Sequence, residues 1–280
     1  EKLFIENNIS KNEIDYLIFC TQSPDYFLPT SACIIQDKLG LNKEIGAIDV
    51  NQGCSGFVYC LGLAKGLVES NQAKNILIIT ADTYSKFINK SDKSVRTLFG
   101  DAGTCTLISN DISGIRNISK IVNGTDGSGA KNLIVPHGGL RHPIDESSHK
   151  EISDDSKNVR SPSNLYMNGQ SIYSFTLKKI PNVFKEILEQ SEYNENKIDK
   201  FIFHQANKFI LDSLQKKLNI PDDKMHRSYK YLGNTVSSTI PIGIHYEMKK
   251  KNQHNTTTAL LLGFGVGLSW AGTIVNYWII

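Results

Sequence analysis

A repeat within the sequence constrains the fold of this chain more than any other feature. The segment Ile14–Phe19 (IDYLIF) recurs 184 residues later as Ile198–Phe203 (IDKFIF). Each copy is followed by a helix-like segment, then by a strand–turn–helix pattern, and then by a further apolar strand, at 75–80 and 258–262. Strands that alternate with helices at this spacing predict parallel sheets with helical cover. We therefore expect a pseudo-symmetric α/β molecule of two duplicated halves.

The repeat also suggests how the chain is divided. We expect one half over residues 1–135, a connecting loop over 136–164 and a second half over 165–280. The loop is rich in Gly, Ser, Asp, Lys and His and contains three prolines, which favours a long surface segment that covers a site. Residues 3–7 align with the end of a second-half helix that we place at about 167–190. We expect the N-terminal strand and most of the matching helix of the first half to be missing.

A cysteine stands at the first strand–turn–helix pattern. Cys54 lies between a short apolar strand that ends at Val50 and a helical pattern that begins at Gly56. Unpaired N–H groups and the helix dipole favour an anion at a helix N-terminus. We therefore expect the Cys54 thiol to lose its proton readily and to serve as a nucleophile. The alternative is a small buried cysteine that fills space between strand and helix.

Two polar residues stand at corresponding places in the second half. His204 ends the strand 201–203, and Asn234 lies at what we interpret as another strand-to-helix turn. Open α/β sheets bind ligands at the carboxyl ends of their strands, so Cys54, His204 and Asn234 are expected to converge. The glycine-rich run 263–269 lacks the spacing of a dinucleotide fingerprint. It suits a tight turn whose backbone N–H could complete an oxyanion hole with that of Cys54.

Five motifs together resemble one family. They are DVNQGCSGF around Cys54, LFGDAG from Leu98, HQAN from His204, GNTVSSTIP around Asn234 and GFGVGLSW near the end. In these motifs the chain resembles β-ketoacyl-acyl-carrier-protein synthase III of the thiolase superfamily. The resemblance implies the five-layered αβαβα thiolase fold, usually as a homodimer, with Cys54, His204 and Asn234 as the catalytic set.

The resemblance also implies a reaction. Cys54 would take an acyl group from acyl-CoA, and a malonyl group on acyl carrier protein would lose CO2 and attack the thioester, as in fatty acid biosynthesis. His204 and Asn234 would hydrogen-bond the developing enolate, and the backbone N–H groups of Cys54 and Val266 would hold the oxyanion. No metal or redox cofactor is implied.

Further residues take a role from the same resemblance. Phe99 would line the acyl pocket, and Leu28 would reach it from the partner subunit. Lys208, Lys216 and Lys217 follow the HQAN motif, where a basic surface would contact CoA or the acidic carrier protein. A solvated helix face is the alternative for these lysines.

The chain departs from the family pattern in three places. Val266 stands where the family has a glycine, Phe209 replaces a common basic residue, and the loop 136–164 is long. These differences suggest a specialised paralogue that makes or transfers an acyl group for a glycan or a secondary metabolite.

Several alternatives share parts of this pattern. The main one is a related acyltransferase that moves the acyl group to an alcohol or amine without decarboxylation. A 3-hydroxy-3-methylglutaryl-CoA synthase should carry a catalytic glutamate where Gln22 stands. Chalcone-synthase-like enzymes differ around Cys54, a papain-like hydrolase would lack the duplicated halves, and a non-catalytic binding subunit should have lost Cys54 or His204.

Composition limits the partners and the compartment that are expected for this chain. The net charge of +3 is too small to imply nucleic acid. No apolar run approaches the length of a membrane span and no signal peptide pattern is present. The five cysteines show no metal-ligand spacing, and their odd number favours a reducing, cytoplasmic setting.

Overall fold

The computed structural model describes residues 1–110, 117–191, 193–250 and 256–277. The strands are β1 (Tyr16–Cys20), β2 (Gly46–Val50), β3 (Asn75–Asp82), β4 (Ala102–Ser109), β5 (Val122–Thr125), β6 (Leu133–Ile134), β7 (Ile152–Ser153), β8 (Val159–Arg160), β9 (Tyr166–Met167), β10 (Lys200–Phe203), β11 (Thr257–Gly265) and β12 (Ser269–Tyr277). The helices are α1 (Lys2–Glu6), α2 (Ser31–Leu39), α3 (Gly56–Glu69), α4 (Lys93–Arg96), α5 (Gly169–Ser191), α6 (Lys208–Leu218), α7 (Tyr229–Leu232) and α8 (Thr239–Lys250).

Two four-stranded sheets carry the repeat. The first has the order β2-β1-β3-β4 and the second the order β10-β11-β12-β5. The repeated segments form β1 and β10, and each pairs in parallel with the later apolar strand of its own half, β3 or β11. β4 and β12 then run antiparallel to those strands. The prediction of two duplicated α/β halves is confirmed.

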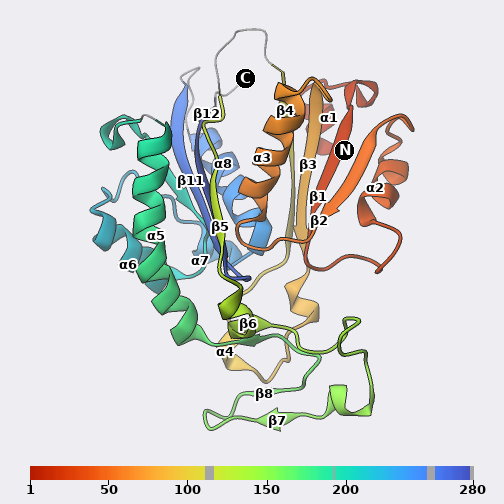
Figure 1. Cartoon of the computed structure of the whole chain (residues 1–280), viewed down its shortest axis with the longest axis vertical. Helices are drawn as coiled ribbons and strands as arrows, with labels where there is room; N and C mark the ends of the chain where they lie inside the picture. Colours follow the sequence, from red (N-terminus) through yellow and green to blue (C-terminus); the bar gives the residue numbers. More distant parts are fainter. Residues whose placement is uncertain (111–116, 192, 251–255, 278–280) are drawn as a thin grey trace.

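The sheets and helices form five layers (Figure 1). α3 and α8 lie between the sheets and contact strands of both. α2 covers the outer face of the first sheet, and α5 and α6 cover the outer face of the second. This is the αβαβα arrangement expected from the sequence.

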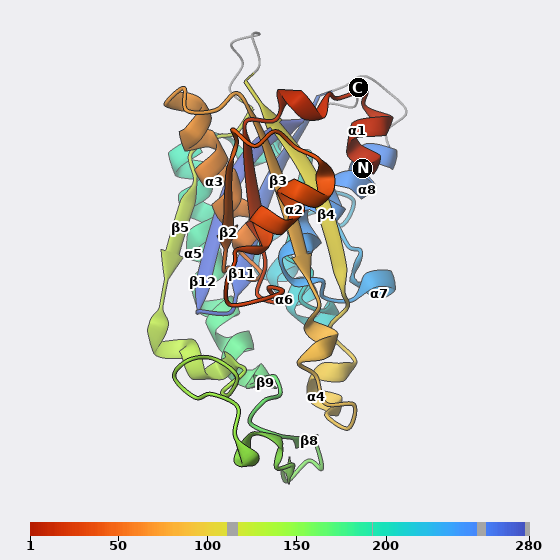
Figure 2. The same ribbon diagram turned by 90° about the vertical axis from the view of Figure 1, so that its right-hand side faces the viewer.

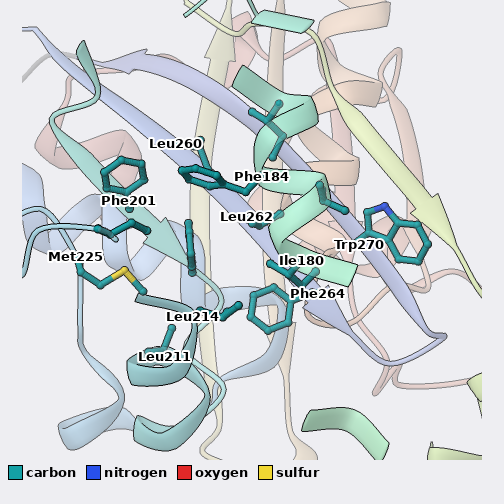
Figure 3. Close-up of a cluster of buried hydrophobic side chains, with 14 of the residues drawn as sticks. Ile180, Phe184, Phe201, Leu211, Leu214, Met225, Leu260, Leu262, Phe264 and Trp270 are labelled. Atoms are coloured by element: carbon teal, nitrogen blue, oxygen red, sulfur yellow. The ribbon is translucent and has the colours of Figure 1, made fainter. Parts of the chain in front are cut away.

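Alternation along the strands explains the layers. In β1, Leu17 and Phe19 pack outward toward α2, whereas Ile18 and Cys20 join the central cluster with α3. In β11, Leu261 faces the central layer, and its neighbours on either side face α5 and α6. Figure 3 shows this outer cluster between α5, α6 and the second sheet. Strands covered on both faces read as continuous apolar runs, as both copies of the repeat do.

The segment 136–164 extends beyond one end of the two sheets and carries β7 and β8 (Figures 1 and 2). Arg160 anchors it, because its guanidinium lies 2.8 Å from both Asp92 and Asp154. The expected division of the chain stays a prediction. The strand β5, although it precedes residue 136, belongs to the second sheet.

One expected strand is absent from the described part of the second half. Before Asn234 the chain forms only an isolated bridge from Met225 to Phe201 and then the short helix α7. The backbone N–H of Ser228 donates to Oε1 of Gln205 instead of to a strand, so the pairing stops at the bridge.

Candidate active site

Cys54 lies in a tight turn between β2 and α3. The N–H of Gly56 donates to the carbonyl of Gly53 over 2.8 Å, which closes the turn around the cysteine. The Cys54 side chain is only 4% exposed and packs in an apolar cluster. The expected place of Cys54, next to the N-terminus of a buried helix, is confirmed by the elements on either side.

Two glycines of β11 allow this strand to pass directly over the cysteine. A Cβ at Gly263 would lie 2.6 Å from the carbonyl oxygen of Cys54, and a Cβ at Gly265 would lie 2.7 Å from its Sγ. Contacts this short do not occur, so no larger residue fits at either position without movement. Ser269 fixes the turn between β11 and β12. Its hydroxyl lies 2.8 Å from that of Ser55 and also donates to the carbonyl of Val266.

The protonation of Cys54 differs from the expectation. Burial raises the pKa of the thiol to about 12, although hydrogen bonds from the backbone N–H groups of Val266 and of Cys54 itself lower it in part. Desolvation disfavours the thiolate more than these donors favour it. The expectation of a readily ionised thiol is therefore wrong, and the oxyanion-hole role of the Cys54 and Val266 N–H groups stays a prediction.

His204 follows β10 and is buried. Its backbone N–H donates to the carbonyl of Leu262 in β11, and its ring packs edge-on against Phe264 with centroids 5.8 Å apart. Nδ1 lies 2.8 Å from the hydroxyl of Thr239. Burial lowers the pKa of His204 to about 3, while the Val236 carbonyl raises it in part. The imidazole is therefore neutral at neutral pH.

Asn234 is held by backbone contacts from the first half. Its N–H donates to the carbonyl of Leu98, and its carbonyl accepts from the N–H of Gly100. These two bonds form an isolated parallel bridge between Asn234 and Phe99. Its side-chain Oδ1 accepts from the N–H of Val236 over 2.9 Å. Since this oxygen faces a backbone donor, the amide nitrogen is the group left to donate elsewhere.

Val236 connects the three predicted residues. Its N–H orients Asn234, its carbonyl bonds to His204, and its side chain packs in the same cluster as Cys54. Its φ of 53° lies in the left-handed region, which is rare for a β-branched residue and costs about 1–3 kcal/mol. Such strain at a buried position is characteristic of functional sites. The structure thus links Cys54, His204 and Asn234 through one turn.

Residues 48–127 match the sequence model for 3-oxoacyl-[acyl-carrier-protein] synthase III, and residues 188–277 match the model for its C-terminal part. The β-ketoacyl-[acyl-carrier-protein] synthase III 2 of Staphylococcus epidermidis is 36% identical over 96% of this chain and 78% of its own. The synthase III of Clostridium perfringens is 34% identical over 99% of this chain and 82% of its own. The chain belongs to the β-ketoacyl-acyl-carrier-protein synthase III family.

Solved structures agree with this assignment. A 3-oxoacyl-(acyl-carrier-protein) synthase III structure with 46% sequence identity has a TM-score of 0.96, over 99% of this chain and 82% of that one. The Burkholderia xenovorans 3-oxoacyl-(acyl-carrier-protein) synthase has 36% identity and a TM-score of 0.91, over 100% and 78%. The resemblance and the thiolase-like fold predicted from the sequence are confirmed, and a papain-like hydrolase is excluded.

The two residues predicted to line the acyl pocket of this synthase III family member lie in different surroundings. Phe99 packs 5.2 Å from the ring of Tyr84, in the cluster that contains Cys54. Leu28 is 82% exposed in a loop whose neighbours Tyr26 and Phe27 are also exposed. Leu28 is therefore not part of the apolar cluster around Cys54, and its reach into a partner stays a prediction.

The predicted contact lysines lie on α6. Lys208 pairs with Asp212, and Lys216 is exposed in the last turn. Lys217, also exposed, donates to the carbonyl of Leu177 in α5 over 2.9 Å, which gives it a structural contact as well. Phe209 is exposed and stacks on Tyr173 at 4.8 Å.

Sequence reasoning missed the residues that orient the site. Thr239 and Val236 belong to the recognised motif around Asn234, but nothing in their side chains signals a contact with His204. Asp82 is buried at the end of β3 and accepts from the N–H groups of Gln22 and Ser237, which ties the two halves together. A lone acidic residue at the end of an apolar strand was the available signal.

The described residues also bear on metal binding, membrane spans and cavities. Across residues 1–110, 117–191, 193–250 and 256–277, no cluster of three or more His, Cys, Asp or Glu could hold a metal ion. None of the described helices combines the length and apolarity needed to span a membrane. A cavity of about 490 Å³ is lined by Lys65, Glu69 and residues 118–120, and it contains none of the predicted catalytic residues.

Proposed function

We propose that this chain is a condensing acyltransferase that joins an acyl group from acyl-CoA to malonyl-acyl carrier protein and releases CO2 and a 3-oxoacyl-acyl carrier protein. Membership of the synthase III family supports this reaction. The observation that carries the residue roles is the hydrogen bond from the Val236 N–H to Oδ1 of Asn234. It leaves the amide nitrogen of Asn234 as a preorganised donor, which a condensing site needs for an enolate.

Acylation of Cys54 is the first step. Sγ attacks the carbonyl carbon of the acyl-CoA thioester, the bond from that carbon to the CoA sulfur breaks, and the cysteine proton ends on the CoA thiol. With the thiol pKa at about 12, Cys54 is neutral at rest, so its proton leaves as the new bond forms. The N–H groups of Cys54 and Val266 stabilise the oxyanion of the tetrahedral intermediate.

Condensation is the second step. The malonyl carboxylate leaves as CO2, and its electron pair forms an enolate whose oxygen accepts hydrogen bonds from Nε2–H of His204 and from Asn234. The enolate carbon attacks the Cys54 thioester, the carbon–sulfur bond breaks, and the thiolate takes a proton from water. Because His204 is neutral with a pKa of about 3, it serves as a hydrogen-bond donor and not as a cation.

The partners and the setting belong to the same proposal. Exposure of Leu28 with two aromatic neighbours supports a homodimer in which Leu28 reaches the partner's acyl pocket. The exposed Lys216 supports docking of the acidic carrier protein near His204. The cysteines at positions 20, 33, 54, 60 and 105 are all free, which supports a reducing, cytoplasmic compartment.

The test is CO2 release from carboxyl-labelled malonyl-acyl carrier protein by enzyme that has first been acylated. We expect CO2 and 3-oxoacyl product in a one-to-one ratio, no acylation in Cys54→Ala, and acylation without condensation in Asn234→Ala. Transfer of the acyl group to an alcohol or amine without CO2 release would contradict the proposal and favour a simple acyltransferase.

A further inference from the structure

Two polar side chains stand among the apolar groups around the nucleophile. Tyr84 is buried in the cluster that contains Cys54 and packs on Phe99. Gln22 lies against the residue before the nucleophile, because a Cβ added at Gly53 would be 2.5 Å from Oε1 of Gln22. Neither side chain has a part in the two chemical steps proposed above.

The two side chains are joined in a defined orientation. The Tyr84 hydroxyl donates to Oε1 of Gln22 over 2.5 Å. In this bond the phenolic hydroxyl is the donor and the amide oxygen is the acceptor. Burial raises the pKa of Tyr84 well above its usual value, which keeps its proton in this bond. No described residue accepts a hydrogen bond from the Gln22 amide nitrogen.

The main chain holds Gln22 in place. Its backbone N–H donates to Oδ1 of Asp82 over 2.8 Å. Asp82 is itself buried and also accepts from Ser237 in the turn that follows Asn234. The amide nitrogen of Gln22 and the remaining lone pair of Tyr84 thus provide a donor and an acceptor near the turn that carries Cys54. Fixed polar groups of this kind increase discrimination, because little ordering is needed on binding.

From this pair we propose that the acyl group carried by Cys54 is a short chain bearing a hydroxyl or carbonyl oxygen, which the Gln22 amide and the Tyr84 hydroxyl bind. The inference rests on the proposed acylation of Cys54 and specifies its substrate class. A hydroxyl can accept from Gln22 and donate to Tyr84, and a carbonyl can accept from Gln22. A plain alkyl chain would bury the amide nitrogen without a partner. Sites built to bind a substrate oxygen reject the analogue that lacks it, by about tenfold or more.

The experiment compares acyl-CoA donors of equal chain length. Butyryl-CoA, 3-hydroxybutyryl-CoA and acetoacetyl-CoA are each incubated with the protein, and the rate of Cys54 acylation is followed by intact mass. We expect at least one of the two oxygenated donors to react about tenfold faster than butyryl-CoA. Equal rates for all three donors would overturn the inference while leaving the acylation of Cys54 intact.

Variants assign the preference to the pair. Gln22→Leu and Tyr84→Phe should each abolish most of the preference, measured as the ratio of oxygenated to butyryl rates, with thermal melting as a check on folding. Tyr59→Phe is the matched control, because that hydroxyl bonds to the Gly124 carbonyl and has no place in the proposed pair. A preference that persists in both variants would overturn the inference. Failure of every donor to acylate Cys54 would instead contradict the proposed function itself.

Discussion

The hydroxyl of Thr239 lies 2.8 Å from Nδ1 of His204, and both side chains are buried. The same hydroxyl also lies 3.1 Å from the carbonyl of Val236, to which it can donate instead. Condensation requires the ring proton of His204 on Nε2, and the Thr239 hydroxyl favours this tautomer when it donates to Nδ1. We therefore propose Thr239 as a positioning residue for His204.

Replacing Thr239 tests this relationship. Thr239→Val keeps the shape but removes the hydroxyl at Nδ1, so this contact no longer favours the tautomer with the proton on Nε2. Loss of one oxyanion donor slows a reaction by about 100-fold to 1,000-fold. We expect a loss of that size in CO2 release, with acylation of Cys54 nearly unchanged and activity restored in Thr239→Ser. Normal CO2 release by Thr239→Val would show that the hydroxyl does not set the tautomer.

Gly265 is predicted to be required for acylation. In Gly265→Ala the new Cβ would lie 2.7 Å from Sγ of Cys54, so β11 or the cysteine turn must move. We expect a loss of acylation of tenfold or more, measured by intact mass, and destabilisation of about 1–3 kcal/mol. Gly66→Ala in α3 is the control, because a Cβ there meets nothing within 4 Å. It should stabilise the protein by about 0.5–1 kcal/mol. Full acylation by Gly265→Ala would contradict the tight approach.

His204 should make the protein less stable in acid. Burial lowers its folded pKa from 6.5 to about 3, so between these values the unfolded chain binds a proton that the folded chain does not. The contribution is fully present above pH 6.5 and is lost as pH falls toward 3. Between pH 7 and pH 5 the unfolding free energy should fall by ~2 kcal/mol more in the wild type than in His204→Gln. Urea unfolding at both pH values measures this difference, and identical losses would mean that His204 is readily protonated in the folded protein.

Carrier-protein docking is predicted to depend on Lys216. Its charge is exposed near the end of the helix that follows His204. Exposed charge pairs contribute about 0.2–1 kcal/mol, so Lys216→Glu should raise the KM for malonyl-acyl carrier protein several-fold at low salt. The effect should shrink as salt rises, and acylation by acyl-CoA should not change. Lys185→Glu on α5, also exposed, is the matched control. An equal response of the two variants would leave Lys216 as part of a solvated surface.

The sequence by itself determined the two halves and the places of Cys54 and His204 at the ends of their strands, and its family motifs indicated the layers. This was possible because the repeat Ile14–Phe19 and Ile198–Phe203, the continuous apolar run in β11 and the turn around Cys54 are local patterns. Local patterns specify strands, helices and the ends at which they meet.

Only the tertiary structure decided how the site is protonated and oriented. The pKa of Cys54 is raised and not lowered because segments distant in the sequence bury it, and the same burial keeps His204 neutral. The contact of Thr239 with His204 and the bond between Gln22 and Tyr84 join residues 35 and 62 positions apart. Burial and hydrogen bonding across such separations arise only when the two sheets pack together, so no local pattern in the sequence contains them.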